Sequence, residues 1–203
     1  MFNFMLIIKS IRCIVADILY ILSGSPIKKL VDMDVHRNIL WDSKNDAIKN
    51  PTLRLNYLLL KKKEFRSVFY YRMRHHKKLV GFSKILLPAI KTIELGNGDI
   101  GGGLMVSHYY SVIYPKTAGK NFRVGPGVVI GRNGDFPTFG DYVYVASNST
   151  VIGDIKIGNK VIIGAGSVVT KDLPDNGVYV GNPARLIKHI DDDQVLLDEI
   201  MWG

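Results

Sequence analysis

The chain has 203 residues, of which 47% are hydrophobic and 22% charged, so it can bury a core and is not a disordered or low-complexity protein. Cys13 is the only cysteine, which excludes an intrachain disulfide and fits a cytoplasmic location. The net charge of +9 favours an anionic partner such as a nucleic acid, a membrane surface or a phosphorylated cofactor. No helix-turn-helix, RNA-binding or zinc-finger pattern accompanies that charge, so we expect no nucleic acid partner.

The first 22 residues are apolar but do not predict a membrane span. Lys9, Arg12 and Asp17 interrupt the apolar run, which leaves no stretch near the roughly 18–20 residues that a span needs. No signal-peptide cleavage site follows either. Spacings of three and four residues predict one stripe of an amphipathic helix, made of Phe4, Ile7, Ile11, Ile14, Ile18 and Leu22. We expect this stripe to be buried or to face another subunit; the alternative is a helix lying on a membrane surface.

A second helical stretch carries much of the positive charge. Pro51 opens a predicted helix with the sequence PTLRLNYLLLKKKEFRSVFYYRMRHH. Residues 61–78 hold eight Lys or Arg against Glu64 alone, which predicts either a solvated helix face or a contact with an anionic partner. Together with the break SGSP at 23–26, these patterns make residues 1–92 a helical region.

From Ile100 onward the spacing of apolar residues changes to six, which excludes a helix. The positions are Ile100, Val106, Val112, Ala118, Val124, Ile130, and, after a nine-residue step, Phe139, Val145, Val151, Ile157, Ile163 and Val169. A Gly, Ala, Ser or Thr follows ten of them, the exceptions being Ile113 and Ile152. A strand this short cannot bury its apolar side alone, so the sequence predicts a mainly β solenoid of stacked coils.

The segment IGNKVIIGAGSVVTKDLPDNGVYVGNPAR at 157–185 resembles the closing coils of the hexapeptide-repeat acyltransferases, and among them the serine acetyltransferases. The resemblance implies a left-handed parallel β-helix over 93–190, preceded by the helical region 1–92 and followed by a tail, 191–203. It also implies a homotrimer with acyl-CoA bound between neighbouring subunits. General chain topology favours the right hand, so the left hand rests on the resemblance alone.

His108 is the predicted catalytic base. The stretch IGGGLMVSHYYSVIYPKT aligns without a gap onto the family segment that carries a catalytic histidine. A neutral imidazole is suited to accept a hydroxyl proton at cellular pH. The resemblance gives it Glu94 as the acidic partner if one residue is deleted, with Asp99 as the rival. The alternatives are a solvated corner histidine and a Glu94 that caps the first coil.

The cofactor residues follow the same pattern. Ser147 and Ala165 are third residues of hexads 18 apart, so one edge of the solenoid should carry both. In the family such positions meet the pantetheine arm. Thr170, Lys171 and Arg185 match positions near the adenosine phosphates, where positive charge is useful. We therefore expect acetyl-CoA as co-substrate, and no metal, because no Cys, His and carboxylate cluster has ligand spacing.

The acceptor positions depart from the family. Asn50 in NPT replaces the aspartate that holds the serine amine, and Asp135 and Phe136 in RNGDFP replace an Arg-His pair. Arg132 is a substitute guanidinium, and Tyr109 adds an aromatic surface for a sugar ring. We therefore expect a sugar hydroxyl of a surface polysaccharide as acceptor, at the inner face of the membrane. The alternatives are L-serine and a non-catalytic trimeric scaffold.

Overall fold

The computed structural model describes residues 2–40 and 47–190, and leaves out the side chains of residues 2–4. The predicted tail 191–203 lies outside the described residues. The chain forms two compact units: residues 1–91 with 102–105, and residues 92–101 with 106–203. The first is the helical unit and the second is the β-helix unit.

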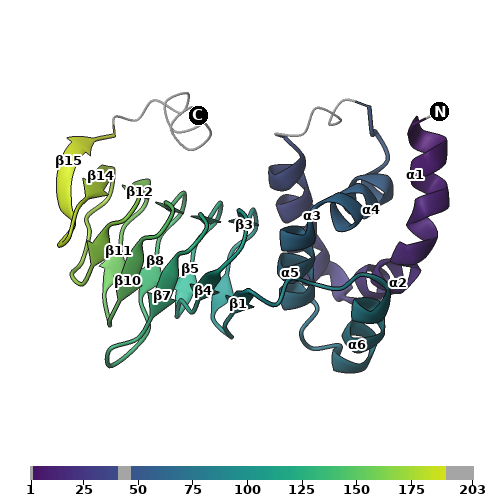
Figure 1. Ribbon diagram of the computed structural model, residues 1–203, viewed down its shortest axis with the longest axis horizontal. Coiled ribbons are helices and arrows are strands. Elements are labelled where there is room, and N and C mark those ends of the chain that lie inside the picture. The colour runs from purple at the N-terminus through teal and green to yellow at the C-terminus, as the bar shows by residue number, and fades with distance from the viewer. Residues whose placement is uncertain (1, 41–46, 191–203) are drawn as a thin grey trace. The chain divides into compact units, whose positions relative to one another are not determined.

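Helices form the first unit (Figure 1). They are α1 (Phe2–Ser10), the 3-10 helix η1 (Ile11–Cys13), α2 (Ile14–Leu22), α3 (Gly24–Ile39), α4 (Pro51–Lys61), α5 (Lys63–Arg72) and α6 (Lys77–Leu86). Asn50 caps α4, because its side-chain oxygen accepts a hydrogen bond from the Leu53 N–H at 3.1 Å. Pro51 follows at the first helical position, where its missing N–H costs nothing. The predicted long helix ends at Lys62, whose backbone is extended.

The predicted apolar stripe of the first helix does not enter the core. Ile11 is 72% exposed and Ile14 is 56% exposed, whereas Cys13, Ala16 and Leu19 are fully buried. The side that carries Leu6, Cys13, Ala16 and Leu19 packs into the core, and the isoleucines stay outside. The expectation of burial is wrong for the single chain. The side chain of Phe4 lies outside the described residues.

The basic run at 61–78 is not one solvated face. Arg66 is 6% exposed and donates to the carbonyls of Leu59, Leu60 and Pro88. Arg72 is 3% exposed. A buried guanidinium needs such acceptors, so two of the eight cations serve the internal structure of the helical unit.

Short parallel strands form the second unit, and each coil stacks on the one before it (Figure 1). The strands are β1 (Ile93–Leu95), β2 (Asp99–Ile100), β3 (Met105–Val106), β4 (Ser111–Ile113), β5 (Thr117–Ala118), β6 (Arg123–Val124), β7 (Val129–Gly131), β8 (Thr138–Phe139), β9 (Tyr144–Val145), β10 (Thr150–Ile152), β11 (Lys156–Ile157), β12 (Val161–Ile163), β13 (Val168–Val169), β14 (Gly177–Val180) and β15 (Arg185–His189). They make three sheets, ordered β1-β4-β7-β10-β13, β11-β8-β5-β2 and β15-β14-β12-β9-β6-β3. Only the last pair, β14 with β15, is antiparallel among the recorded strand pairs of the described residues. The predicted β-helix with an N-terminal helical region is confirmed.

The six-residue spacing predicts the inward side chains with one exception. Eleven of the twelve positions are less than 9% exposed, but Val112 is 36% exposed and Ile113 beside it is fully buried. The inward residue thus comes seven positions after Val106, whereas six separate Val124 from Ile130. One corner of the β-helix therefore contains an extra residue, and that corner holds His108.

Candidate functional site

His108 lies in the corner between β3 and β4, in a backbone conformation that is uncommon for a side chain with a Cβ atom. Its φ is 63° and that of Tyr110 is 64°. Tyr110 matches Gly127 one coil later, whose φ is 68°, because Val112 pairs with Val129. His108 has no such counterpart and is the additional left-handed residue of the longer corner. Five other non-glycine residues of the β-helix unit also have a positive φ, so what distinguishes this corner is that it holds two such residues within three positions.

The same edge of the β-helix carries His108, Ser147 and Ala165. Val124 pairs with Val145 and Val145 with Ile163, which puts Pro126, Ser147 and Ala165 at successive levels, and the longer corner one level before them holds both His108 and Tyr109. Backbone hydrogen bonds join these levels, from Asn148 N–H to Pro126 O at 2.8 Å and from Gly166 N–H to Ser147 O at 2.9 Å. Coils stack about 4.8 Å apart, so Ala165 stands roughly 14 Å along the edge from His108. The predicted base and two predicted cofactor residues therefore form one row.

Buried serines brace this edge. Ser111 and Ser149 are fully buried and donate to the carbonyls of Gly125 at 3.0 Å and Gly164 at 2.8 Å. Because each hydroxyl joins the inside of the corner to a neighbouring coil, the edge is held in place while His108 and Ser147 stay outside. These hydrogen bonds hold the backbone of the edge in one geometry, which a binding site requires.

Glu94 has a hydrogen-bond partner other than His108. It lies on the outer face of β1, and its Oε2 accepts from the Tyr114 hydroxyl at 3.3 Å. Tyr114 follows the C-terminal end of strand β4, whereas His108 precedes its N-terminal end. Asp99 is exposed on β2, in another sheet. The pairing of either carboxylate with His108 stays a prediction.

The loop at 132–137 gathers the predicted acceptor residues. Asp135 accepts a hydrogen bond from Lys116 Nζ at 2.6 Å, and this contact holds the pKa of the Asp135 carboxyl below its usual range. The Arg132 guanidinium lies 5.5 Å from the centre of the Phe136 ring, which stacks on Tyr114 at 6.2 Å. Sequence reasoning missed Lys116 and Tyr114. Their place one coil before the loop is the signal that could have found them, since Thr117 pairs with Thr138.

The acceptor loop and His108 lie at different edges of the β-helix. Strands β4 and β7 are neighbours in one sheet. His108 lies before the N-terminal end of β4, whereas the loop follows the C-terminal end of β7 and leads into β8. One chain therefore does not bring them together. Tyr109 is on the His108 side: it is 46% exposed, and its ring packs edge-on against that of Tyr110 at 6.4 Å.

A pocket of about 160 Å³ gathers the residues predicted to lie near the cofactor phosphates. Thr170, Lys171 and Arg185 line it together with Pro183 and neighbouring apolar side chains. Lys171 and Arg185 are exposed and give the pocket two cations. Paired positive side chains beside a small pocket suit a phosphate group.

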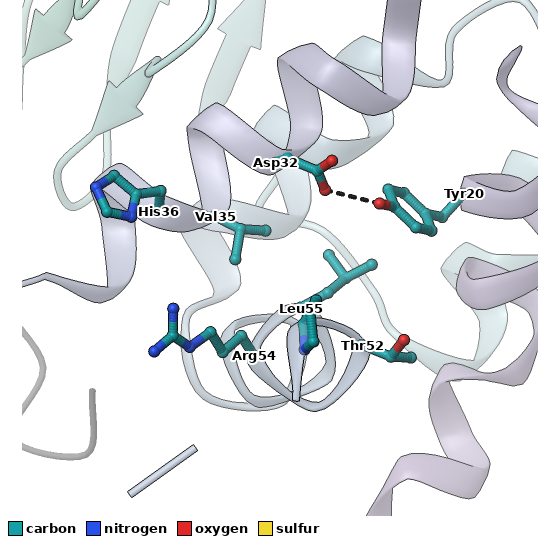
Figure 2. A pocket seen from close by; sticks show the side chains of 8 residues that line it. Tyr20, Asp32, Val35, His36, Thr52, Arg54 and Leu55 are labelled. Atoms are coloured by element: carbon teal, nitrogen blue, oxygen red, sulfur yellow. Dashed lines mark hydrogen bonds between the residues drawn. The ribbon is translucent and has the colours of Figure 1, made fainter. Parts of the chain in front are cut away.

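A larger pocket, of about 420 Å³, lies in the helical unit (Figure 2). In it, the Tyr20 hydroxyl points to Asp32 and donates to it at 2.7 Å. Arg54 and His36 stand on the other side, from α4 and α3. None of the predicted transfer residues lines this pocket, so it is separate from the row described above.

The β-helix of six-residue coils defines the class, and comparisons with known proteins define the family. A family model described as "Bacterial transferase hexapeptide (six repeats)" matches residues 136–171. A serine acetyltransferase of Helicobacter pylori is 35% identical over 131 residues, which cover 58% of this chain and 77% of that protein. The crystal structure of Neisseria gonorrhoeae serine acetyltransferase (CysE) in complex with serine has a TM-score of 0.63 and 26% identity, over 82% of this chain and 71% of that one.

Serine acetyltransferase 4 of Arabidopsis thaliana is 35% identical over 100 residues, 46% of this chain. The match spans only 28% of the plant protein's length. The bacterial relative is covered over most of its length. The chain belongs to the hexapeptide-repeat acyltransferases, in their serine acetyltransferase-like subfamily.

Proposed function

We propose that the protein transfers an acetyl group from acetyl-CoA to a hydroxyl group, with His108 as the general base. The observation that supports this most directly is the row of His108, Ser147 and Ala165 along one braced edge. An extended acyl-CoA arm running along Ser147 and Ala165 presents its thioester to His108. Its phosphates then reach toward the pocket of Lys171 and Arg185.

The chemistry requires one proton acceptor at the reacting end of the row. The imidazole of His108 takes the proton as the acceptor oxygen bonds to the acetyl carbon. The same imidazolium returns a proton to the sulfur as the thioester bond breaks, so the base is regenerated. Tyr109 and Tyr110 flank the base with exposed aromatic faces.

L-serine is the acceptor that the relatives support. The bacterial relative is a serine acetyltransferase, and so is the protein whose structure was solved in complex with serine. The acceptor loop also contains charges of both signs, since Lys116 and Arg132 suit a carboxylate and Asp135 suits an ammonium group. This arrangement offsets the loss of the family's aspartate at Asn50. A sugar hydroxyl is the second candidate, favoured by the exposed rings of Tyr109 and Tyr110.

We also propose that the active protein is a homotrimer. The acceptor loop lies at one edge of the β-helix and His108 at another, so a second subunit has to bring the loop of one chain to the base of the next. Mixing two inactive variants, His108→Ala and Asp135→Ala, tests this directly. Activity that returns on mixing, after subunit exchange, supports a shared site, and a mixture that stays inactive contradicts it.

The reaction is tested by measuring thiol release from acetyl-CoA with L-serine, with D-serine and with a panel of nucleotide sugars. Saturable turnover with L-serine alone supports L-serine as the acceptor. Turnover with a sugar alone supports a sugar hydroxyl as the acceptor instead. Loss of the general base in His108→Ala should lower the rate about 10²–10⁴-fold. His75→Ala, at an exposed position outside the coils, is the control. A His108→Ala variant as active as the control contradicts the proposed mechanism.

A further inference from the structure

An exposed row of isoleucines runs along the first two helices. Its members are Ile7, Ile11, Ile14, Ile18 and Ile21, which are spaced four, three, four and three residues apart and are 54%, 72%, 56%, 42% and 64% exposed. Met5, Ile8 and Leu22 widen the row and are each at least half exposed. A row of exposed apolar residues at helical spacing marks an interaction site, because exposed apolar residues that are scattered singly do not line up on one helix face.

Helix α6 extends this surface. It packs against α2 and η1, and Arg12 of η1 donates a hydrogen bond to the Leu86 carbonyl at 2.9 Å. On α6, Phe82 is 64% exposed, Ile85 is 75% exposed and Leu86 is 38% exposed. We call the exposed apolar residues of α1, η1, α2 and α6 the apolar patch: Met5, Ile7, Ile8, Ile11, Ile14, Ile18, Ile21, Leu22, Phe82, Ile85 and Leu86.

The charges on the same helices are almost all positive. The exposed ones are Lys9, Arg12, Lys77, Lys78 and Lys84. The single acidic residue among these elements, Asp17, is half-buried and accepts a hydrogen bond from the Asn56 side chain at 3.3 Å. The apolar patch therefore shares its helices with exposed cations, and these helices carry no exposed carboxylate to offset them.

The positive charge on these helices indicates which kind of partner binds the apolar patch. A second copy of the chain docked on the same helices would bring these cations against their own copies, and like charges brought together oppose association. An anionic bilayer offers the opposite charge together with an apolar interior. We propose that α1, η1, α2 and α6 dock on the surface of an anionic phospholipid bilayer, with the apolar patch in the boundary between headgroups and acyl chains and the cations on lipid phosphates.

The lengths of the helices fit a surface position. The isoleucine row spans two nine-residue helices joined by η1, and in the described part of the chain no helix is long and apolar enough to cross a bilayer. A helix lying flat buries its apolar face about 5–10 Å deep. Each cation near an anionic surface adds roughly fivefold to binding at low salt, so Lys9, Arg12 and Lys84 together make the binding depend strongly on lipid charge and on salt.

Co-sedimentation with vesicles tests the proposal on the full chain. Vesicles of phosphatidylcholine alone are compared with vesicles that also contain phosphatidylglycerol. We expect binding to the anionic vesicles, at least tenfold weaker binding to neutral ones, and release by added salt. Binding that does not depend on phosphatidylglycerol, or no binding to either vesicle, overturns the proposal.

Substitutions then locate the contact. The variant Ile11→Ser, Ile14→Ser, Ile85→Ser removes exposed side chains only, and we expect it to lose at least tenfold in vesicle binding while its circular dichroism and thermal midpoint stay unchanged. The control is Leu186→Ser, Ile187→Ser, which removes two exposed apolar side chains from β15, 41% and 63% exposed. Equal loss in the control variant contradicts the assigned face.

Self-association through the patch is the remaining outcome. Sedimentation equilibrium without lipid compares the molar mass of the patch variant with that of the wild type. If the variant forms smaller particles and the wild type does not bind anionic vesicles, the patch is a contact between copies and the proposal is wrong. The thiol-release assay with soluble substrates is independent of this result, so failure of membrane docking and failure of the proposed transfer reaction can be told apart.

Discussion

The guanidinium of Arg72 donates two hydrogen bonds to the carboxylate of Asp34, at 2.8 and 3.1 Å, and the two side chains are 2% and 1% exposed. Asp34 Oδ1 also accepts from the backbone N–H groups of Gly103 and Leu104, both at 2.8 Å. The carboxylate therefore has four donors in a place that water does not reach. Such a charge is tolerated inside a protein only because it is fully paired.

Replacing Asp34 should destabilise the helical unit strongly. Asp34→Ala leaves the Arg72 guanidinium buried without its counter-ion, which costs about 3–5 kcal/mol. Asp32→Ala is the matched control on the same helix, because Asp32 is exposed and accepts its hydrogen bond from the half-buried Tyr20, so its loss should cost less than about 1 kcal/mol. The free energy of unfolding is measured by urea denaturation. Similar losses in the two variants would contradict the view that burial makes the difference.

The repeat predicted the architecture of the β-helix but not its one irregular corner. Six-residue spacing follows from stacked coils, so eleven of the twelve inward positions could be predicted from the sequence. Val112 and Ile113 are both aliphatic, and hydrophobicity alone does not say which of them turns inward. The extra residue at His108 decides it, and only the strand register reveals that residue.

Substitutions at Val112 and Ile113 test this register. Ile113 is fully buried, so Ile113→Ala removes three carbons from the core and should lower the free energy of unfolding by about 2–5 kcal/mol. Val112→Ala affects an outward side chain and should cost less than about 1 kcal/mol. Thermal or urea unfolding of the β-helix signal gives both values. The reverse order would restore the uninterrupted six-residue spacing.

The helical unit was harder to predict. The spacing of Ile11 and Ile14 identifies an apolar helix face but does not say what covers it, and a second face, with Cys13, Ala16 and Leu19, packs into the core instead. The run 61–78 looked like a solvated face because lysine and arginine are usually exposed. Arg66 and Arg72 are buried through acceptors that lie far away in the sequence.

The candidate site was predictable where it depends on the repeat. Ser147 and Ala165 share an edge because one coil separates them, and the same argument brings His108 onto that edge. The contacts of Glu94 and Asp135 depend instead on which outward side chains of neighbouring coils reach each other. Tyr114 and Lys116 supply those contacts, and no motif marks either residue.

The Lys116 contact should be visible in the titration of Asp135. Lys116 lowers the pKa of the Asp135 carboxyl, so this group should titrate below the ordinary aspartate range of about 3.9 in the native protein. Lys116→Met removes the donor and should raise the midpoint toward that range. Side-chain carboxyl NMR signals, followed from neutral pH downward, give both midpoints. An unchanged midpoint in Lys116→Met would show that the contact does not persist in solution.

The thiol of Cys13 should be unreactive in the native state. The side chain is fully buried, and burial raises the pKa of its thiol to about 12. At pH 8 an ordinary thiol is partly ionised and reacts readily with a disulfide reagent, whereas the Cys13 thiol stays protonated and shielded. Labelling should therefore wait for unfolding, and in urea its extent should follow the unfolding of the helical unit.

The same pKa predicts how pH affects stability through this group. An unfolded thiol ionises above about pH 8.5, while the native one stays protonated until about pH 12, so the contribution of Cys13 is complete at neutral pH and is lost as the pH rises between those values. Cys13→Ala removes the titrating group, so its stability should fall less steeply than that of the wild type above pH 8.5.

A Cys13→Ala, Ser25→Cys variant carries its thiol on an exposed position and is the control for labelling. Rapid labelling of native wild type, at the rate of this control, would contradict burial of Cys13.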